Sequence, residues 1–210
     1  MKPRLRGVSH KWACIISVPF GVVMVIAAAS TRARVAVAVY ALSLVALFGV
    51  SALYHRIDWR SVAARRWMRR LDHSMIFVLI AGTYTPFALL VLHGRIGTVI
   101  LITVWAGALG GVLLNLVWTR APRWLAVTVY IALGWVAVAA LPQLAIGLGV
   151  SGLSLLVLGG LLYSAGGVIY AIKRPDPVPT VFGYHEVFHV LVIAAAALQY
   201  AVIAFWVVPG

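Results

Sequence analysis

Seven long apolar segments dominate this 210-residue chain. Each has about 20 residues, the helix length that crosses a hydrocarbon core of about 30 Å. Strands of a membrane barrel would be about ten residues long and would alternate apolar with polar side chains, and the sequence has neither feature. We therefore predict seven transmembrane helices, at residues 12–30, 35–55, 71–92, 96–118, 124–141, 149–172 and 182–208.

The composition agrees with a membrane protein, since 64% of the residues are hydrophobic and only 10% are charged. The breaks between the segments are short and carry arginine, glycine or proline, so no soluble domain is inserted between them. The first segment lacks a convincing cleavage site and is expected to remain as a helix. The predicted fold is an all-α integral membrane protein, a seven-transmembrane-helix bundle with a single domain over residues 1–210.

The 17 lysines and arginines are distributed unevenly between the two ends of the predicted helices. When the ends are numbered alternately from the N-terminus, only Arg32, Arg34 and Arg95 fall on the far side. Short cytoplasmic loops carry most of the positive charge, so the N-terminus is predicted to be cytoplasmic and the C-terminus outside. The net charge of +13 then reflects topology and contact with anionic lipid headgroups, and it requires no nucleic-acid partner.

An H-E-x-x-H cluster, formed by His185, Glu186 and His189, lies inside the last apolar segment. Two histidines four residues apart share one face of a helix, where their imidazoles can bind one metal ion. Ionisable groups within a membrane span are costly and therefore indicate a site. The single cysteine, Cys14, excludes an intrachain disulfide and a cysteine-rich metal site.

Counting spans brings further polar residues to the same depth. Ser51 and His55 fall in the last cytoplasmic turn of the second helix, and Asp72 falls in the first turn of the third. They share a layer with His185 and His189, near the cytoplasmic face. We predict His55, His185 and His189 as ligands of a Zn2+ ion whose fourth position is open to water, although iron, nickel and copper also accept imidazole. Asp72 would hold that water or take its proton, and Ser51 would be a hydrogen-bonding or electrophilic aid.

Three blocks of sequence carry a family resemblance. They are Ser-Ala-Leu-Tyr-His at 51–55, Leu-Asp-His-Ser at 71–74 continuing to Ala-Gly-Thr-Tyr-Thr-Pro at 81–86, and His-Glu-Val-Phe-His at 185–189. In this order they resemble the signature blocks of the bacterial hemolysin III proteins, which belong with the progestin and adiponectin receptor family. The resemblance covers almost the whole chain and implies a multi-pass protein of the bacterial inner (plasma) membrane.

The resemblance also implies a site. In the receptor branch, histidines matching His55, His185 and His189 bind zinc, and an aspartate matching Asp72 contacts zinc-bound water. Those receptors and the related alkaline ceramidases look like amide hydrolases that act on ceramide-type lipids. By analogy, this protein would hydrolyse a lipid amide or ester, with membrane lipids as its partners. It lacks the long N-terminal domain of the receptor branch, so a hormone ligand is not carried over.

Three other functions compete with the hydrolase. The H-E-x-x-H pattern also occurs in intramembrane metalloproteases, where the glutamate matching Glu186 is the general base, but their second motif, an Asp-Gly on a later helix, is missing here. A receptor-like or membrane-homeostasis protein would use zinc only to tie helices together. A pore-forming hemolysin, suggested by the family name alone, would permeabilise membranes without consuming lipid.

The remaining polar residues are expected to have structural roles. His10 and His93 are predicted to lie at the membrane interface, and His73 is left out of the ligand set. Glu186 either faces the cytoplasmic interface or a basic loop, or takes part in catalysis. The buried amide of Gln199 is expected either to bond between helices, which we favour, or to line a cavity.

Two further expectations concern helix geometry. Pro86 is expected to kink the third helix, with Thr83 and Thr85 able to satisfy the freed backbone groups. Asn115, like other amides within spans, is expected either to bond between helices or to line a cavity.

Overall fold

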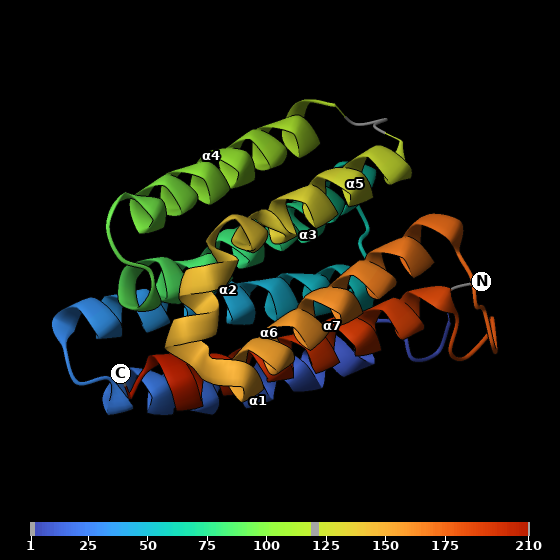
Figure 1. Ribbon diagram of the computed structural model, residues 1–210. Coiled ribbons are helices and arrows are strands. Elements are labelled where there is room, and N and C mark those ends of the chain that lie inside the picture. The colour runs from blue at the N-terminus through green and yellow to red at the C-terminus, as the bar shows by residue number, and fades with distance from the viewer. Residues whose placement is uncertain (1–2, 119–121, 210) are drawn as a thin grey trace.

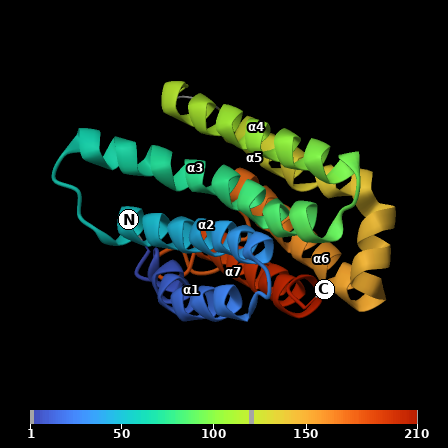
Figure 2. The same ribbon diagram turned by 90° about the vertical axis from the view of Figure 1, so that its left-hand side faces the viewer.

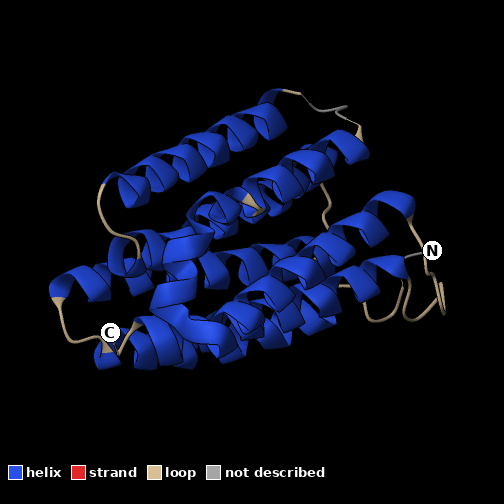
Figure 3. Cartoon of the chain, in the orientation of Figure 1, coloured by secondary structure: helices blue, strands red, loops and turns tan. Residues whose placement is uncertain are grey.

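The computed structural model describes residues 3–118 and 122–209, and within those ranges the chain is helical (Figures 1 and 3). Its only extended pairing there is an isolated bridge between Val178 and Phe182. The predicted all-α class is therefore confirmed. The elements are α1 (Val8–Ala27), α2 (Thr31–Arg56), α3 (Val62–Pro86), the π-helical turn η1 (Phe87–Val91), α4 (Arg95–Val117), α5 (Arg123–Gly134), the 3-10 helix η2 (Val136–Ala140), α6 (Leu141–Ile172), α7 (Tyr184–Val202) and the π-helical turn η3 (Ile203–Val207).

Six helical segments in the described part of the chain are long and apolar enough to cross a membrane, where the sequence predicts seven. The difference lies in Trp124–Ile172, a continuous run of 49 residues that contains two predicted spans. No polar loop divides this run, but its helix is interrupted at Gly134 and again at Gly149, whose backbone has φ 63° and ψ −177°. Figure 1 shows that α5 and α6 run in opposite directions, so the chain turns back inside the run.

Helix α2 lies between α1 and α3 and forms much of the buried core (Figure 2). Ala36 and Val37 are fully buried, and Tyr40 donates a hydrogen bond across the bundle to the backbone carbonyl of Ala196 on α7. The outer surface is apolar as well, with Ile146 and Val150 each 86% exposed. An apolar exterior around a packed interior is the pattern expected of a helical bundle surrounded by lipid.

Helix α3 begins earlier than the apolar segment on which its prediction rests. The basic stretch 62–70 is helical, and it extends α3 well past the neighbouring helices (Figure 2). The guanidinium of Arg70 lies over the ring of Trp67, 4.6 Å from its centroid. Such paired cationic and aromatic side chains are typical of the membrane–water interface.

Pro86 coincides with a change of helix type, because the π-helical turn η1 begins at the next residue. The hydroxyls of Thr83 and Thr85 donate to the carbonyls of Leu79 and Ala81. A proline frees the carbonyl four residues before it, which here belongs to Gly82. The two threonines therefore bond to neighbouring carbonyls and not to the freed carbonyl of Gly82.

The N-terminal segment is attached to the loop that precedes α7. The backbone N–H of Arg4 donates to the carbonyl of Thr180 over 3.0 Å, and that of Leu5 donates to Val181 over 3.1 Å. The N-terminal segment and the loop before α7 therefore meet at one end of the bundle, the end that carries the N-terminus in Figure 1, and the C-terminus lies at the other end.

Candidate metal centre

Three imidazoles meet at this end of the bundle. His55 lies in the last turn of α2, while His185 and His189 lie in the first two turns of α7. One ring nitrogen from each lies within 4.8 Å of the others, and all three side chains are buried. The Nε2 atoms of His55 and His185 are 3.1 Å apart. Two helices that are distant in sequence thus contribute to one cluster that could hold a metal ion.

The donor set suits zinc. With Zn–N distances of about 2.0–2.1 Å, neighbouring ligands of a tetrahedral zinc ion are roughly 3.3 Å apart, close to the separation between His55 and His185. The Nδ1 atom of His189 is buried and has no hydrogen-bond partner among the described residues. Iron, nickel and copper accept the same nitrogen ligands, so the three histidines could hold a metal ion but do not select zinc over these metals.

Asp72 and Ser51 complete the cluster predicted from the sequence. Asp72, on α3, places Oδ2 3.8 Å from Nε2 of His55, and its side chain is only 11% exposed. Ser51 lies one turn before His55 on α2, is buried, and hydrogen-bonds with the Asp72 side chain. The structure therefore brings all five predicted site residues together, as three potential ligands with a carboxyl group and a hydroxyl beside them.

His10 was missed by the sequence analysis. The prediction that it lies at the interface is wrong, because its side chain is only 3% exposed and stacks on the ring of His189. The two ring centroids are 3.7 Å apart and the planes are within 10° of parallel. Counting spans could have indicated the position of His10, because it places the start of the first helix in the same layer as the other histidines. His93, by contrast, is exposed as expected.

Glu186 has a structural role in α7. Its side chain is 2% exposed and forms an ion pair with Arg6 from the N-terminal segment. Its second oxygen accepts the backbone N–H of Gly183 over 2.8 Å, which caps the start of the helix. Both carboxylate oxygens are thus engaged by Arg6 and Gly183, whereas a metalloprotease would need this carboxylate free to act beside the metal.

His73 lies outside the three-histidine cluster, in agreement with its omission from the ligand set. Its Nε2 atom is 3.4 Å from the hydroxyl of Tyr170 on α6, and its backbone carbonyl accepts a hydrogen bond from Tyr130 on α5. His73 therefore links α3 to the helices on the opposite side of the interior.

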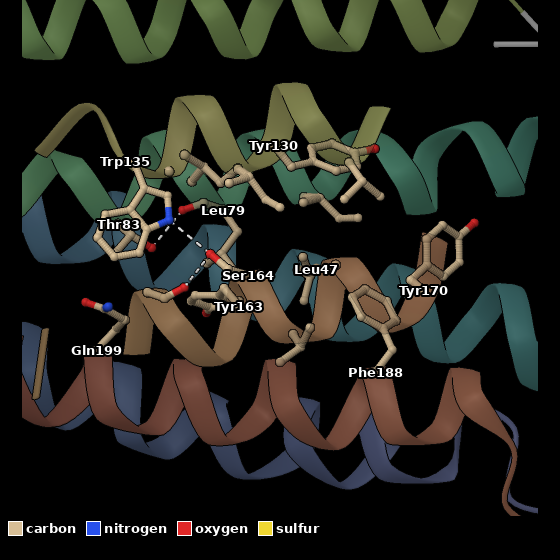
Figure 4. Close-up of a pocket in the computed structure, with 18 of the residues that line it drawn as sticks. Leu47, Leu79, Thr83, Tyr130, Trp135, Tyr163, Ser164, Tyr170, Phe188 and Gln199 are labelled. Atoms are coloured by element: carbon tan, nitrogen blue, oxygen red, sulfur yellow. Dashed lines mark hydrogen bonds between the residues drawn. The ribbon is translucent and has the colours of Figure 1, made fainter. Parts of the chain in front are cut away.

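A cavity of about 500 Å³ extends from the histidine cluster into the interior of the bundle. Figure 4 shows its lining, with Tyr170 and Phe188 toward one end and Trp135, Ser164 and Gln199 toward the other. The lining is mainly apolar and includes Leu47, Leu79, Ile80, Leu153, Leu156 and Val192. The shape suits an elongated apolar ligand with a polar group at the cluster.

Comparison with known proteins gives a consistent set of relatives. The model of the family described as "Haemolysin-III related" matches residues 1–200. Hemolysin-3 of Bacillus cereus is 33% identical over 206 residues, which cover 97% of this chain and 90% of the relative. The Hemolysin-3 homolog of Bacillus subtilis (strain 168) is 33% identical over 205 residues, which cover 96% of this chain and 92% of the relative.

A more distant similarity reaches animal proteins. The human Monocyte to macrophage differentiation factor is 25% identical over 165 residues, which cover 77% of this chain and 66% of that protein. The bacterial relatives match over nearly their whole length, so the similarity includes the helices that carry the histidines, the aspartate and the cavity lining.

Proposed function

Because this chain belongs to the haemolysin-III-related family of membrane proteins, we propose that it is a zinc-dependent hydrolase of lipid amides or esters. One observation carries the proposal: three buried imidazoles, with a carboxyl group 3.8 Å from one of them, stand at the end of a cavity large enough for a lipid chain. Metal, proton acceptor and apolar binding space are the elements that such a hydrolysis requires.

The proposal includes a topology of seven spans with a cytoplasmic N-terminus, in the inner membrane of a bacterium. The reversal of direction between α5 and α6 supports the seventh crossing. The asymmetry of lysine and arginine supports the orientation, because the end of the bundle that carries the N-terminus also carries most of these residues. The histidine cluster would then lie close to the cytoplasmic surface.

In this mechanism, His55, His185 and His189 would hold zinc, which would polarise the substrate carbonyl and acidify a water molecule. The Asp72 carboxylate takes a proton from the attacking water and passes it to the leaving amine or alcohol. The new C–O bond replaces the C–N or ester C–O bond, and the products are a fatty acid and an amine or alcohol. Ser51 orients the Asp72 carboxyl group through its hydrogen bond.

The cavity determines which substrates are suitable. An acyl chain would lie along its apolar lining, which places the carbonyl at the cluster and keeps water away from the chain. The basic extension of α3, residues 62–70, would face the headgroups of anionic lipids beside the entrance. Lipids with one acyl chain in the cavity and a polar remainder at the cytoplasmic surface are the expected class.

Metal content is the first test. Protein purified in detergent is expected to contain about one zinc ion per chain by elemental analysis, and His55→Ala and His185→Ala variants are expected to lose it. His93→Ala serves as the matched control, because that histidine is exposed at a distance from the cluster. A metal-free wild-type protein would contradict the proposal.

Activity is the second test. The zinc-loaded protein is incubated with an N-acyl amino alcohol and the matching ester, and the released fatty acid is measured by mass spectrometry. Asp72→Asn is expected to keep the zinc and lose the release. If Asp72→Asn keeps the protein's function in cells while no lipid is cleaved, zinc serves only to join α2 and α7. Leakage of liposomes without lipid cleavage would instead indicate a pore-forming protein.

A further inference from the structure

The inner end of the cavity is polar, although it lies deep among apolar helices. The indole N–H of Trp135 donates to the hydroxyl of Ser164 over 2.9 Å, and Ser164 donates to the carbonyl of Gly160 over 2.8 Å. Trp135 follows the end of α5 at Gly134, so the interruption of that helix places the indole here. Figure 4 shows Trp135, Ser164, Tyr163 and Gln199 gathered at this end.

Two polar atoms in this group lack partners. The side chain of Gln199 is only 4% exposed, and its Nε2 donates to the carbonyl of Leu156 over 3.2 Å. The other amide atom, Oε1, is buried with no hydrogen-bond partner in the described parts of the chain, and the same is true of the Tyr163 hydroxyl. Because an unsatisfied buried polar group destabilises a protein, two of them beside one cavity indicate a ligand group.

The spacing along α7 gives the distance of these atoms from the histidine cluster. Gln199 follows His189 by ten residues on one continuous helix. At 1.5 Å of rise per residue, the two side chains are about 15 Å apart along the axis. With carbon–carbon bonds of about 1.5 Å in a zigzag chain, this distance corresponds to roughly a dozen chain atoms.

We propose that Gln199 and Tyr163 form a subsite for a hydroxyl group on the acyl chain of the substrate, about a dozen atoms from the carbonyl. A hydroxyl can donate to Oε1 of Gln199 or accept from the phenol of Tyr163, whereas an unsubstituted chain can do neither. The inference rests on the proposed function, because it places the reacting carbonyl at the histidine cluster. It adds a preference for hydroxylated chains over unsubstituted ones.

Gly159 leaves the space that the Gln199 side chain occupies against α6. A Cβ added at Gly159 would lie 2.7 Å from Nε2 of Gln199, so the absence of a side chain there lets Gln199 reach the α6 backbone. The glutamine is thereby held by one of its two amide atoms, and the other is left for the ligand. A bound water molecule is the competing occupant, and it would give no preference for any chain.

The test is a binding measurement with fatty acids, which resemble the acyl product. Detergent-purified zinc-loaded protein is titrated with 12-hydroxyoctadecanoic acid, 5-hydroxyoctadecanoic acid and octadecanoic acid, each competing with a fluorescent fatty acid. The 12-hydroxy acid is expected to bind about tenfold more tightly than the other two, since hydrogen bonds to buried groups contribute roughly that factor. Equal affinities of the three acids would overturn the proposal.

Variants test whether Gln199 and Tyr163 cause the preference for the 12-hydroxy acid. Gln199→Leu and Tyr163→Phe are expected to reduce it to less than about threefold, with zinc content and thermal unfolding unchanged. Asn115→Leu is the matched control, because this amide lines the same cavity from α4. If the control abolishes the preference as fully as Gln199→Leu does, or if Gln199→Leu leaves it intact, the assignment is wrong.

The outcome separates this inference from the proposed hydrolysis, because binding requires no turnover. A protein that cleaves lipid amides but binds the three acids equally has the proposed activity and no such subsite. A protein that prefers the 12-hydroxy acid and cleaves nothing has the subsite and a different function.

Discussion

Replacing Glu186 with glutamine separates the structural role of this residue from a catalytic one. Its carboxylate caps α7 through the N–H of Gly183 and forms an ion pair with Arg6. Glutamine keeps an oxygen for the cap but removes the charge that faces Arg6. Glu186→Gln is therefore expected to weaken the attachment of the N-terminal segment and to leave the histidine cluster intact.

The magnitude follows from burial. The Glu186 side chain is 2% exposed and that of Arg6 is 19% exposed, so water screens the pair only partly. A hydrogen bond to a charged group contributes about 1.5–3 kcal/mol, and we expect a loss of about 2 kcal/mol. For a chain of this length, each kcal/mol lowers Tm by about 2–4 °C, which gives roughly 4–8 °C. Glu186→Ala also removes the cap and should lose about 1 kcal/mol more.

The assay compares thermal unfolding, zinc content and fatty-acid release for the wild type, Glu186→Gln and Arg6→Gln. The double variant tests the contact directly, because the two single effects should not add if the residues stabilise each other. Asp176→Asn is the matched control: Asp176 accepts the N–H of Tyr184 over 2.8 Å but lies at an exposed position, so its Tm should change by no more than about 3 °C.

The refuting result concerns activity. If Glu186→Gln keeps its zinc and its Tm but releases fatty acid at least a hundredfold more slowly, the carboxylate takes part in the chemistry, as in a metalloprotease. Additive losses in the double variant would show instead that the ion pair contributes nothing to stability.

Three further predictions concern the site and its scaffold. Asp72→Asn should bind zinc like the wild type and lower the rate of fatty-acid release by about 10²–10⁴-fold; an unchanged rate would exclude Asp72 as the proton acceptor. His10→Ala should lower Tm by removing a stacked ring from a buried position, and His10→Phe should recover most of the loss; equal Tm values for the two variants would contradict a packing role. Gly82→Ala should lower stability by about 1–3 kcal/mol, because the added Cβ would collide with the side chain of Ser43 on α2, whereas the same change at Gly110, which faces open space, should have little effect. Denaturation of both glycine variants in detergent measures the difference.

Much of the candidate site could be predicted because counting the predicted spans assigns each helix end, and the residues in it, to one side of the membrane. His55, Asp72 and His189 lie on three helices, and counting crossings is enough to bring them to one layer. The same count places His10 there, but without a second ligand nearby in the sequence its position gave no reason to choose it over the interface. The stacking that buries it depends on how α1 packs against α7, which no local pattern encodes.

The extent and lining of the cavity could not be predicted. Its inner end depends on the break after Gly134, and the surrounding sequence stays apolar without the polar residues that usually mark a loop. The orientation of Glu186 could be predicted only in part. Adjacent residues on a helix point about 100° apart, so Glu186 is expected to point away from His185. Its ion pair with Arg6 joins residues 180 positions apart, and no local pattern in the sequence indicates it. Sequence reasoning therefore identified residues that the structure brings together, and it left their surroundings undetermined.

The attachment of the N-terminal segment to the loop before α7 has a consequence for biogenesis. During translation the first helix enters the membrane long before the ribosome has made the last, so Arg4 and Leu5 wait for their backbone partners until synthesis is nearly complete. The same delay applies to the cluster, since His185 and His189 are supplied last. A chain interrupted before α7 would carry His55 and Asp72 without His185 and His189, so the three-histidine cluster can form only after the last helix has been made.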